Sequence, residues 1–125
     1  MKATAVVMQW VVRLTGVALI VLGLMFWAGR AHTLIPLHML LGLVLVVALW
    51  ILAGFAARAG ASSGMVALAF LWGLVVLGLG MTQTRLLVGS AHWIVQVVHL
   101  FVGLAAMGMA EGLAARVKRS TPAAA

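Results

Sequence analysis

Histidines in two similar stretches are the residues of this sequence best suited to chemistry. One stretch, AHTLIPLHMLLG, covers residues 31–42, and the other, SAHWIVQVVHLFVG, covers residues 90–103. Each contains Ala-His near its start, then a second histidine, and then a glycine four residues after that histidine. Imidazole is a good ligand for iron and a common axial ligand of haem. We therefore predict that the second histidines, His38 and His99, face each other and hold one haem as its two metal ligands.

The glycines that follow these histidines are predicted to make room for the haem. Gly42 lies four residues after His38, and Gly103 lies four residues after His99. On a helix this spacing places each glycine on the same face as its histidine, where a missing side chain leaves space for a flat macrocycle. Gln96, one turn before His99, shares that face and could hydrogen-bond either a ligand or a neighbouring helix.

The first histidines of the two stretches are assigned to the membrane interface. Each lies six or seven residues before the second histidine, a separation of about 9–10 Å along a helix axis and too little for two stacked porphyrins. With Arg30 and Arg85, we expect His32 and His92 either to bind haem propionates or a quinol head group, or to act as ordinary interfacial anchors.

The elements that must position these residues are transmembrane helices. The chain has 125 residues, 66% of them hydrophobic, a mean hydropathy of +1.29 and a single acidic residue, Glu111. A soluble domain of this size needs a polar surface that this composition cannot supply. Four apolar runs are long enough to span a bilayer, for which about 20 residues are needed. We predict an all-α transmembrane four-helix bundle with no separate soluble domain. With no cysteine, disulfides and c-type haem attachment are excluded.

The predicted helices cover about residues 5–28, 33–57, 65–82 and 91–115. Thr33 is a plausible N-cap for the second helix, and Pro36 falls in its first turn, where the missing N–H costs little. The membrane domain is expected to span residues 1–117. Residues 118–125 are polar and then rich in Pro and Ala, and we expect them to form a disordered tail.

The basic residues predict orientation rather than nucleic-acid binding. The net charge is +7, but most of the basic residues stand singly at the ends of apolar runs. By the positive-inside rule, both termini are predicted to lie in the cytoplasm, with the protein a multi-pass protein of a bacterial inner membrane. Arg13 is expected to pair with Glu111 near that side, because pairing lowers the cost of charges in a membrane. The basic residues assigned to the cytoplasmic side, besides Arg13, are Lys2, Arg58, Arg116, Lys118 and Arg119.

The two halves of the chain look like related helical hairpins. Val-Leu-Gly-Leu at 21–24 recurs at 76–79, and a histidine stretch follows in both halves. The offset drifts from 55 residues at this tetrapeptide to 61 residues between His38 and His99. A parallel repeat makes the two histidine helices run in the same direction through the membrane.

At His38 and His99 the chain resembles membrane b-type cytochromes, in which four-helix bundles hold haem between histidines of two helices. The resemblance covers the architecture and the His38/Gly42 and His99/Gly103 pairs. It implies a low-spin haem b that carries single electrons, with quinol or a membrane redox partner as donor or acceptor. A six-coordinate iron leaves no open site for oxygen, so an electron carrier or subunit is expected rather than a complete enzyme. Many such proteins carry two haems on four deeply placed histidines, and this chain departs from that pattern.

Other interpretations of the same residues stay open. The histidines could be structural and hydrogen-bond across a helix interface, with the glycines allowing close approach, or they could serve a non-haem metal or proton transfer. The protein could be a haem-free accessory subunit of a membrane complex, or a homodimer. Its size also resembles small multidrug transporters, but those depend on a Glu in the first helix, where this chain has Arg13.

Overall fold

The protein is a bundle of four long helices joined by short turns. The structure, a computed structural model, describes residues 1–120 of the 125-residue chain. Each long helix is apolar and long enough to cross a membrane, and the described residues contain no strand, so the predicted all-α bundle is confirmed. The elements are α1 (Lys2–Trp27), the 3₁₀ turn η1 (His32–Leu34), α2 (Ile35–Arg58), α3 (Ser63–Thr82), the 3₁₀ turn η2 (Gln83–Arg85) and α4 (His92–Ser120).

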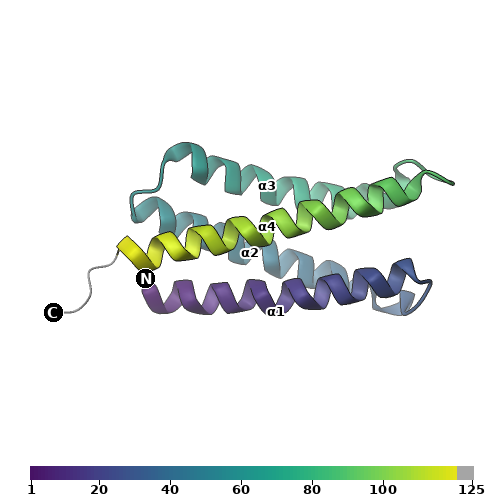
Figure 1. The fold of residues 1–125 in the computed structure, drawn as a ribbon, viewed down its shortest axis with the longest axis horizontal. Helices are drawn as coiled ribbons and strands as arrows, with labels where there is room; N and C mark the ends of the chain where they lie inside the picture. The colour runs from purple at the N-terminus through teal and green to yellow at the C-terminus, as the bar shows by residue number, and fades with distance from the viewer. Residues whose placement is uncertain (121–125) are drawn as a thin grey trace.

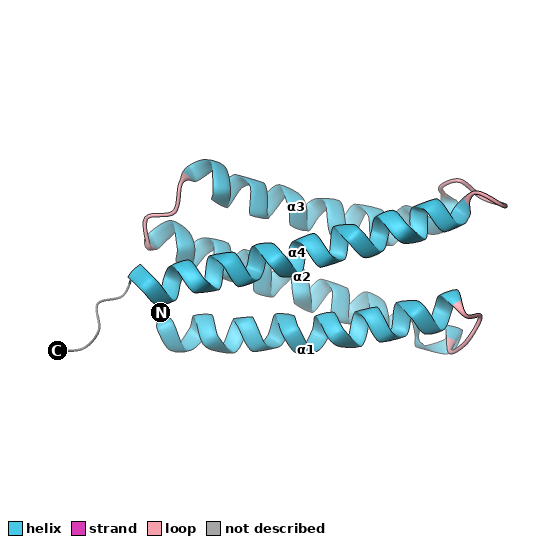
Figure 2. Cartoon of the chain, viewed as in Figure 1, coloured by secondary structure: helices cyan, strands magenta, loops and turns pink. Residues whose placement is uncertain are grey.

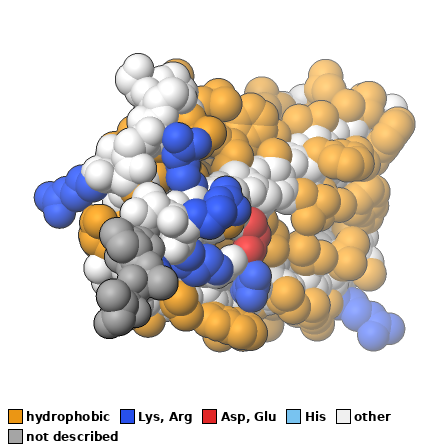
Figure 3. All heavy atoms as spheres, turned by 60° about the vertical axis from the view of Figure 1, so that its left-hand side comes forward, with side chains coloured by type: hydrophobic (Ala, Val, Ile, Leu, Met, Phe, Trp, Pro, Cys, Tyr) orange, Lys and Arg blue, Asp and Glu red, His pale blue; other side chains and the backbone are white. Residues whose placement is uncertain are grey.

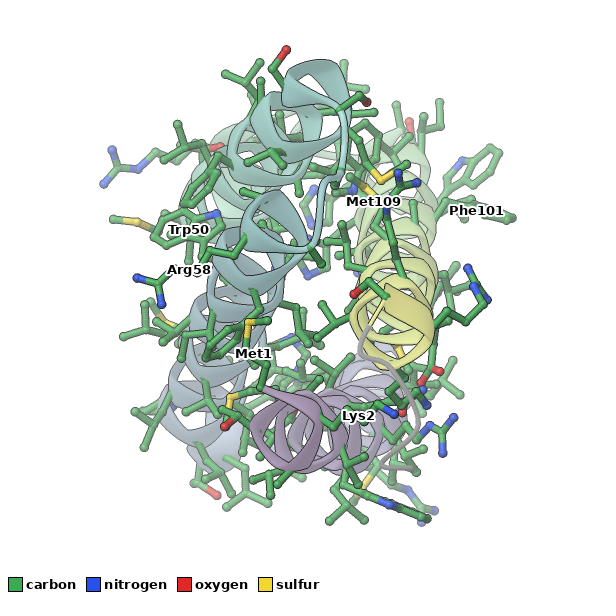
Figure 4. The ribbon with its side chains drawn as sticks, turned by 90° about the vertical axis from the view of Figure 1, so that its left-hand side faces the viewer. Met1, Lys2, Trp50, Arg58, Phe101 and Met109 are labelled. Atoms are coloured by element: carbon green, nitrogen blue, oxygen red, sulfur yellow. The ribbon has the colours of Figure 1, made fainter. Side chains whose placement is uncertain are left out.

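The helices alternate in direction, so that α2 and α4 run the same way (Figure 1). The N-terminus and the end of α4 lie at the same end of the bundle as the α2–α3 turn, and the other two turns lie at the opposite end (Figure 2). Seen along the bundle, α1, α2, α3 and α4 follow one another around the axis (Figure 4). The helices α2 and α4 are therefore the diagonal pair, and they pack against each other across the centre.

The start of α2 differs from the prediction at its cap. Pro36 does occupy the first turn, where its missing N–H removes no helical hydrogen bond. Thr33 is not the N-cap: it lies inside η1, and Leu34 precedes α2 without a side-chain cap. The physical reason is the backbone at Ala31, which is left-handed with φ of 57° and starts a 3₁₀ turn that leads directly into the helix.

The end of α4 also differs from the prediction. The helix continues through Ser120, beyond its predicted end near residue 115, so residues 118–120 of the predicted tail are helical, and the domain boundary at Lys118 stays a prediction. Packing on α1 explains this, because Val117 is buried and the Lys118 Nζ donates a hydrogen bond of 2.8 Å to Gln9 Oε1. The remainder of the predicted tail, 121–125, lies outside the described residues.

Two tryptophans and two glycines tie the helices together near the middle of the bundle. The Trp50 Nε1 donates to the Phe70 carbonyl at 3.2 Å, and the Trp72 Nε1 donates to the Val102 carbonyl at 3.0 Å. A side chain at Gly73 would collide with Trp50, so only glycine allows this close approach of α2 and α3. Gly16 lies against the side chain of Met107, between α1 and α4, although this flexible side chain can move more easily than the Trp50 ring. These are the small-residue contacts that transmembrane helices use to pack.

Side-chain packing is concentrated in the half of the bundle that carries the termini. The half with the predicted haem site is made of residues 17–44 and 77–105. Within these ranges, only Leu22 and Val95 are buried. The bundle is therefore tightly packed at one end and thinly filled at the other. The buried side chains of the packed half are Ala5, Gln9 and Val12 of α1, Leu45, Val46, Ala48, Leu49, Leu52, Ala53 and Ala56 of α2, Ala69 and Val76 of α3, and Ala106, Ala110, Leu113, Ala114 and Val117 of α4.

The predicted ion pair lies in the packed half, on the seam between α1 and α4. The Arg13 Nε donates to Glu111 Oε1 at 2.6 Å and its Nη2 donates to Oε2 at 2.9 Å, while the Gln9 amide also donates to that carboxylate. The expectation that Arg13 and Glu111 pair is confirmed. Figure 3 shows the acidic side chain surrounded by basic ones on this face.

Candidate histidine site

His38 and His99 meet across the centre of the bundle. Their ring centroids are 6.2 Å apart, and the ring planes are tilted by 40°. His38 lies in the first turns of α2 and His99 about two turns into α4, and both side chains are partly buried. The diagonal helices α2 and α4 run in the same direction, so residues near the start of each helix lie at the same end of the bundle. The structure thus brings together the two histidines that the sequence singled out.

Each imidazole lies against a glycine of the helix that precedes it in the same hairpin. A Cβ built on Gly23 of α1 would be 3.7 Å from Cε1 of His38, and one built on Gly80 of α3 would be 3.6 Å from Cε1 of His99. The two hairpins therefore seat their histidines in the same way. Sequence reasoning missed both roles. Gly23 lies inside the repeated Val-Leu-Gly-Leu, but its counterpart in the structure is Gly80 rather than the aligned Gly78, whose Cβ would meet no atom within 4 Å.

Phe26 is a second residue that the sequence did not single out. Its ring meets His38 edge-on, with centroids 5.4 Å apart and planes at 61°, and stacks on His32 at 6.2 Å and 22°. Phe26 follows Gly23 by three residues, so both lie on one face of α1. The three-residue spacing of Gly23 and Phe26, shortly before the first histidine stretch, is the sequence feature that could have revealed the role of Phe26. Phe26 fixes His38 from one side and links it to the outer histidine.

The two imidazoles lack polar partners. The Nδ1 atoms of His38 and His99 are buried, and neither has a hydrogen-bond partner among the described residues. A buried polar atom without a partner costs about 1–3 kcal/mol, so two of them in one place call for an explanation such as a bound ion or ordered water. Among residues 1–120, no third His, Cys, Asp or Glu joins the pair to complete a metal cluster. A metal held here would therefore receive two ligands from the protein.

The predicted glycines Gly42 and Gly103 border open space. Both are partly buried, yet a Cβ at either would meet no atom within 4 Å. Glycine inside a helix costs about 1 kcal/mol relative to alanine, and close helix approach, as at Gly73, is the usual compensation. That compensation is missing here. These two positions leave unfilled volume on the faces of the helices that carry the histidines.

The other predicted site residues lie around the pair without touching it. Gln96 is partly buried one turn before His99, and its side chain makes no hydrogen bond within the described chain. The His92 Nδ1 is 3.1 Å from the Leu86 carbonyl oxygen in the α3–α4 connection. Arg85 ends η2. Arg30 borders a surface hollow of about 540 Å³ on α1. Within residues 1–120, none of these four side chains makes a ring contact or a hydrogen bond with His38 or His99.

No protein-family model, no curated protein and no solved structure matches this chain. The functional argument therefore depends on the geometry of the two histidines and on the space around them.

Proposed function

We propose that the protein binds one haem b between His38 and His99 and carries single electrons in the membrane. The observation that carries the proposal is the 6.2 Å separation of the two ring centroids. A zinc-bound imidazole nitrogen lies about 2.0–2.1 Å from the metal, so two rings that each turned one nitrogen toward a shared ion at that distance would have centroids about 6.3 Å apart, close to the observed spacing. The unpartnered Nδ1 atoms show that neighbouring side chains do not satisfy these rings.

The number of protein ligands favours haem over a bare metal ion. A zinc site takes three or four protein ligands, whereas His38 and His99 have no third ligand within residues 1–120. Haem needs only two, because its porphyrin supplies the other four nitrogens. The absence of hydrogen bonds to either ring in the described chain also counts against purely structural histidines, which are expected to hydrogen-bond across the helix interface.

Open space beside two glycines supports the proposal of a macrocycle at this level. Gly42 and Gly103 border open space on the faces of the two histidines, and the core is thinly filled at this level. Bound haem, held by His38 and His99, would supply a reversible one-electron change at iron. The chain's part is to hold the two rings and to keep water away with apolar side chains. Quinol is the proposed electron partner, with Arg30, Arg85, His32 and His92 near the membrane interface where propionates or a quinol head group would lie.

The first test is a reduced-minus-oxidised absorbance spectrum of protein purified from haem-replete cells. We expect a b-type spectrum, with one haem per chain by pyridine haemochrome assay. His38→Ala and His99→Ala should each abolish it, whereas His32→Ala and His92→Ala leave both proposed iron ligands in place and should keep the bis-histidine spectrum. A colourless preparation that retains its helical circular dichroism would overturn the proposal.

A haem-free accessory subunit is the second candidate, and the Arg13–Glu111 pair favours it. These side chains are 44% and 36% exposed on the outside of α1 and α4, within helices proposed to span the membrane. Charges facing lipid are costly, and a partner protein covering the seam would remove that cost. Gentle detergent extraction from native membranes should then recover a stable complex, which Arg13→Gln would weaken. A lone monomer would count against this function.

A further inference from the structure

A groove between α3 and α4, at the end of the bundle that carries the termini, has both a basic and an apolar part. Its volume is about 360 Å³. The residues that line it are Met65, Leu68, Met109, Gly112, Leu113, Arg116 and Arg119. The two arginines are three residues apart on α4, so they lie on one helix face. The apolar residues extend from them toward the middle of the bundle.

Within residues 1–120, the charges of the groove have no acidic side chain as a partner. Glu111 is the one acidic side chain of the whole sequence, and it is bound by Arg13 and Gln9 on the α1 side of α4. The Arg116 Nη2 donates to the Gly60 carbonyl at 3.1 Å, which holds its guanidinium at the α2–α3 turn. Arg119 is exposed beside it. Two guanidinium groups without a carboxylate make a binding site for an anion, and their fork geometry matches phosphate.

The apolar part of the groove fits a hydrocarbon chain. Met65 and Leu68 are 40% and 52% exposed on α3, which leaves their side chains available at the groove wall. Gly112 forms an open floor, because a Cβ there would meet no atom within 4 Å. A soluble phosphate would use the arginines but not this apolar extension. A phospholipid would use both parts.

We infer that this groove binds an anionic phospholipid, with its phosphate on Arg116 and Arg119 and an acyl chain along Met65, Leu68 and Gly112. Basic pockets between transmembrane helices are suited to such head groups, and anionic lipids are abundant in the cytoplasmic leaflet, which the basic residues predict for this end. The inference is independent of haem, since the groove lies in the other half of the bundle.

Native mass spectrometry of the purified full chain tests the inference, with phosphatidylglycerol, phosphatidylcholine and inorganic phosphate as probes. Phosphatidylglycerol should bind about tenfold more tightly than phosphatidylcholine. The double variant Arg116→Gln/Arg119→Gln should lose this preference. The control Lys2→Gln/Arg58→Gln removes the same charge from the same end outside the groove and should keep it.

A second variant tests the acyl-chain part without changing any charge. Gly112→Leu adds a side chain at the floor of the groove, at a position where a Cβ would meet no atom within 4 Å. It should lower phosphatidylglycerol binding by about the same factor as the arginine variant. Equal binding of both lipids, equal losses in the two charge variants, unchanged binding in Gly112→Leu, or displacement of the lipid by inorganic phosphate would each overturn the inference.

Discussion

The two imidazoles are placed where each needs a partner that residues 1–120 do not provide. His38 is held by Phe26 and Gly23, and His99 lies against Gly80, so their positions are restricted by apolar atoms. Their buried Nδ1 atoms receive no hydrogen bond within the described chain. A natural protein tolerates such a cost mainly where a ligand or function removes it. This is the residue-level basis for the proposal that the pair binds a cofactor.

The glycine beside each histidine should be sensitive to side-chain size. Gly80→Leu should displace the His99 ring and abolish the haem spectrum, because a Cβ already reaches van der Waals contact at 3.6 Å and the rest of leucine extends beyond it. Gly80→Ala should be tolerated for the same reason. Haem stoichiometry by pyridine haemochrome assay is the measurement. Gly78→Leu is the matched control, since that position borders open space. Equal effects of leucine at 78 and 80 would show that the contact with His99 is not what matters.

The Arg13–Glu111 pair should be coupled in stability. Glu111→Gln leaves Arg13 without its carboxylate in a membrane-spanning helix, and Arg13→Gln leaves the carboxylate with the Gln9 hydrogen bond and the nearby charge of Lys118, so each should lower the melting temperature in detergent. The double variant Arg13→Gln/Glu111→Gln should cost less than the sum of the single variants, because neither charge is then left unpaired. Additive losses of stability would show that Arg13 and Glu111 are not energetically coupled. Lys2→Gln, which removes a basic charge from the first turn of α1, is the control.

At the scale of the helices, a feature could be predicted from sequence where neighbouring residues determine it, and not where a contact between helices does. Long apolar runs predict membrane helices by themselves, and regular spacing places Gly42 on the His38 face. The parallel course of α2 and α4 follows from an even number of crossings, so the meeting of the two histidines was predictable. Gly80 was not, because its role depends on the register between α3 and α4. The extension of α4 to Ser120 was also missed, because it depends on a contact between helices, from Lys118 to Gln9.

The space beside α2 and α4 should be needed for haem but not for folding. Gly42→Leu and Gly103→Leu should each lower haem content, because the leucine side chain occupies the volume proposed for the macrocycle. Stability of the haem-free protein should be unchanged or higher by about 1 kcal/mol, since glycine is a poor helix former. Pyridine haemochrome assay and thermal unfolding measure the two effects.

Gly73→Leu provides the contrast for these variants. It meets Trp50 at the α2–α3 contact, so it should destabilise the whole bundle. Full haem content in both Gly42→Leu and Gly103→Leu would place the macrocycle elsewhere. A loss of stability equal to that of Gly73→Leu would mean that these positions serve packing instead.

Across the whole molecule, packing and proposed function are divided between the two ends. The end with the termini holds most of the buried core and the ion pair. Most of the basic side chains visible in Figure 3 also lie at this end. The other end holds the two histidines among fewer buried neighbours. Ligand sites are commonly found in the less stable parts of a protein, while the rest supplies rigidity. In this bundle, the packed half would fix the directions of α2 and α4 and thereby the separation of His38 and His99.

The orientation of the bundle decides which side of the membrane lies near the proposed haem. The positive-inside rule predicts that the α3–α4 connection faces outward and that the α2–α3 turn faces the cytoplasm. The chain has no cysteine, so a single introduced cysteine reports its own location. Val88→Cys, at a position 78% exposed in the α3–α4 connection, should react with a membrane-impermeant maleimide on intact bacterial cells. Ser63→Cys, at the exposed start of α3, should react only after permeabilisation. The reverse pattern would place His38 and His99 near the cytoplasmic side and would move the expected quinol partner to the inner leaflet.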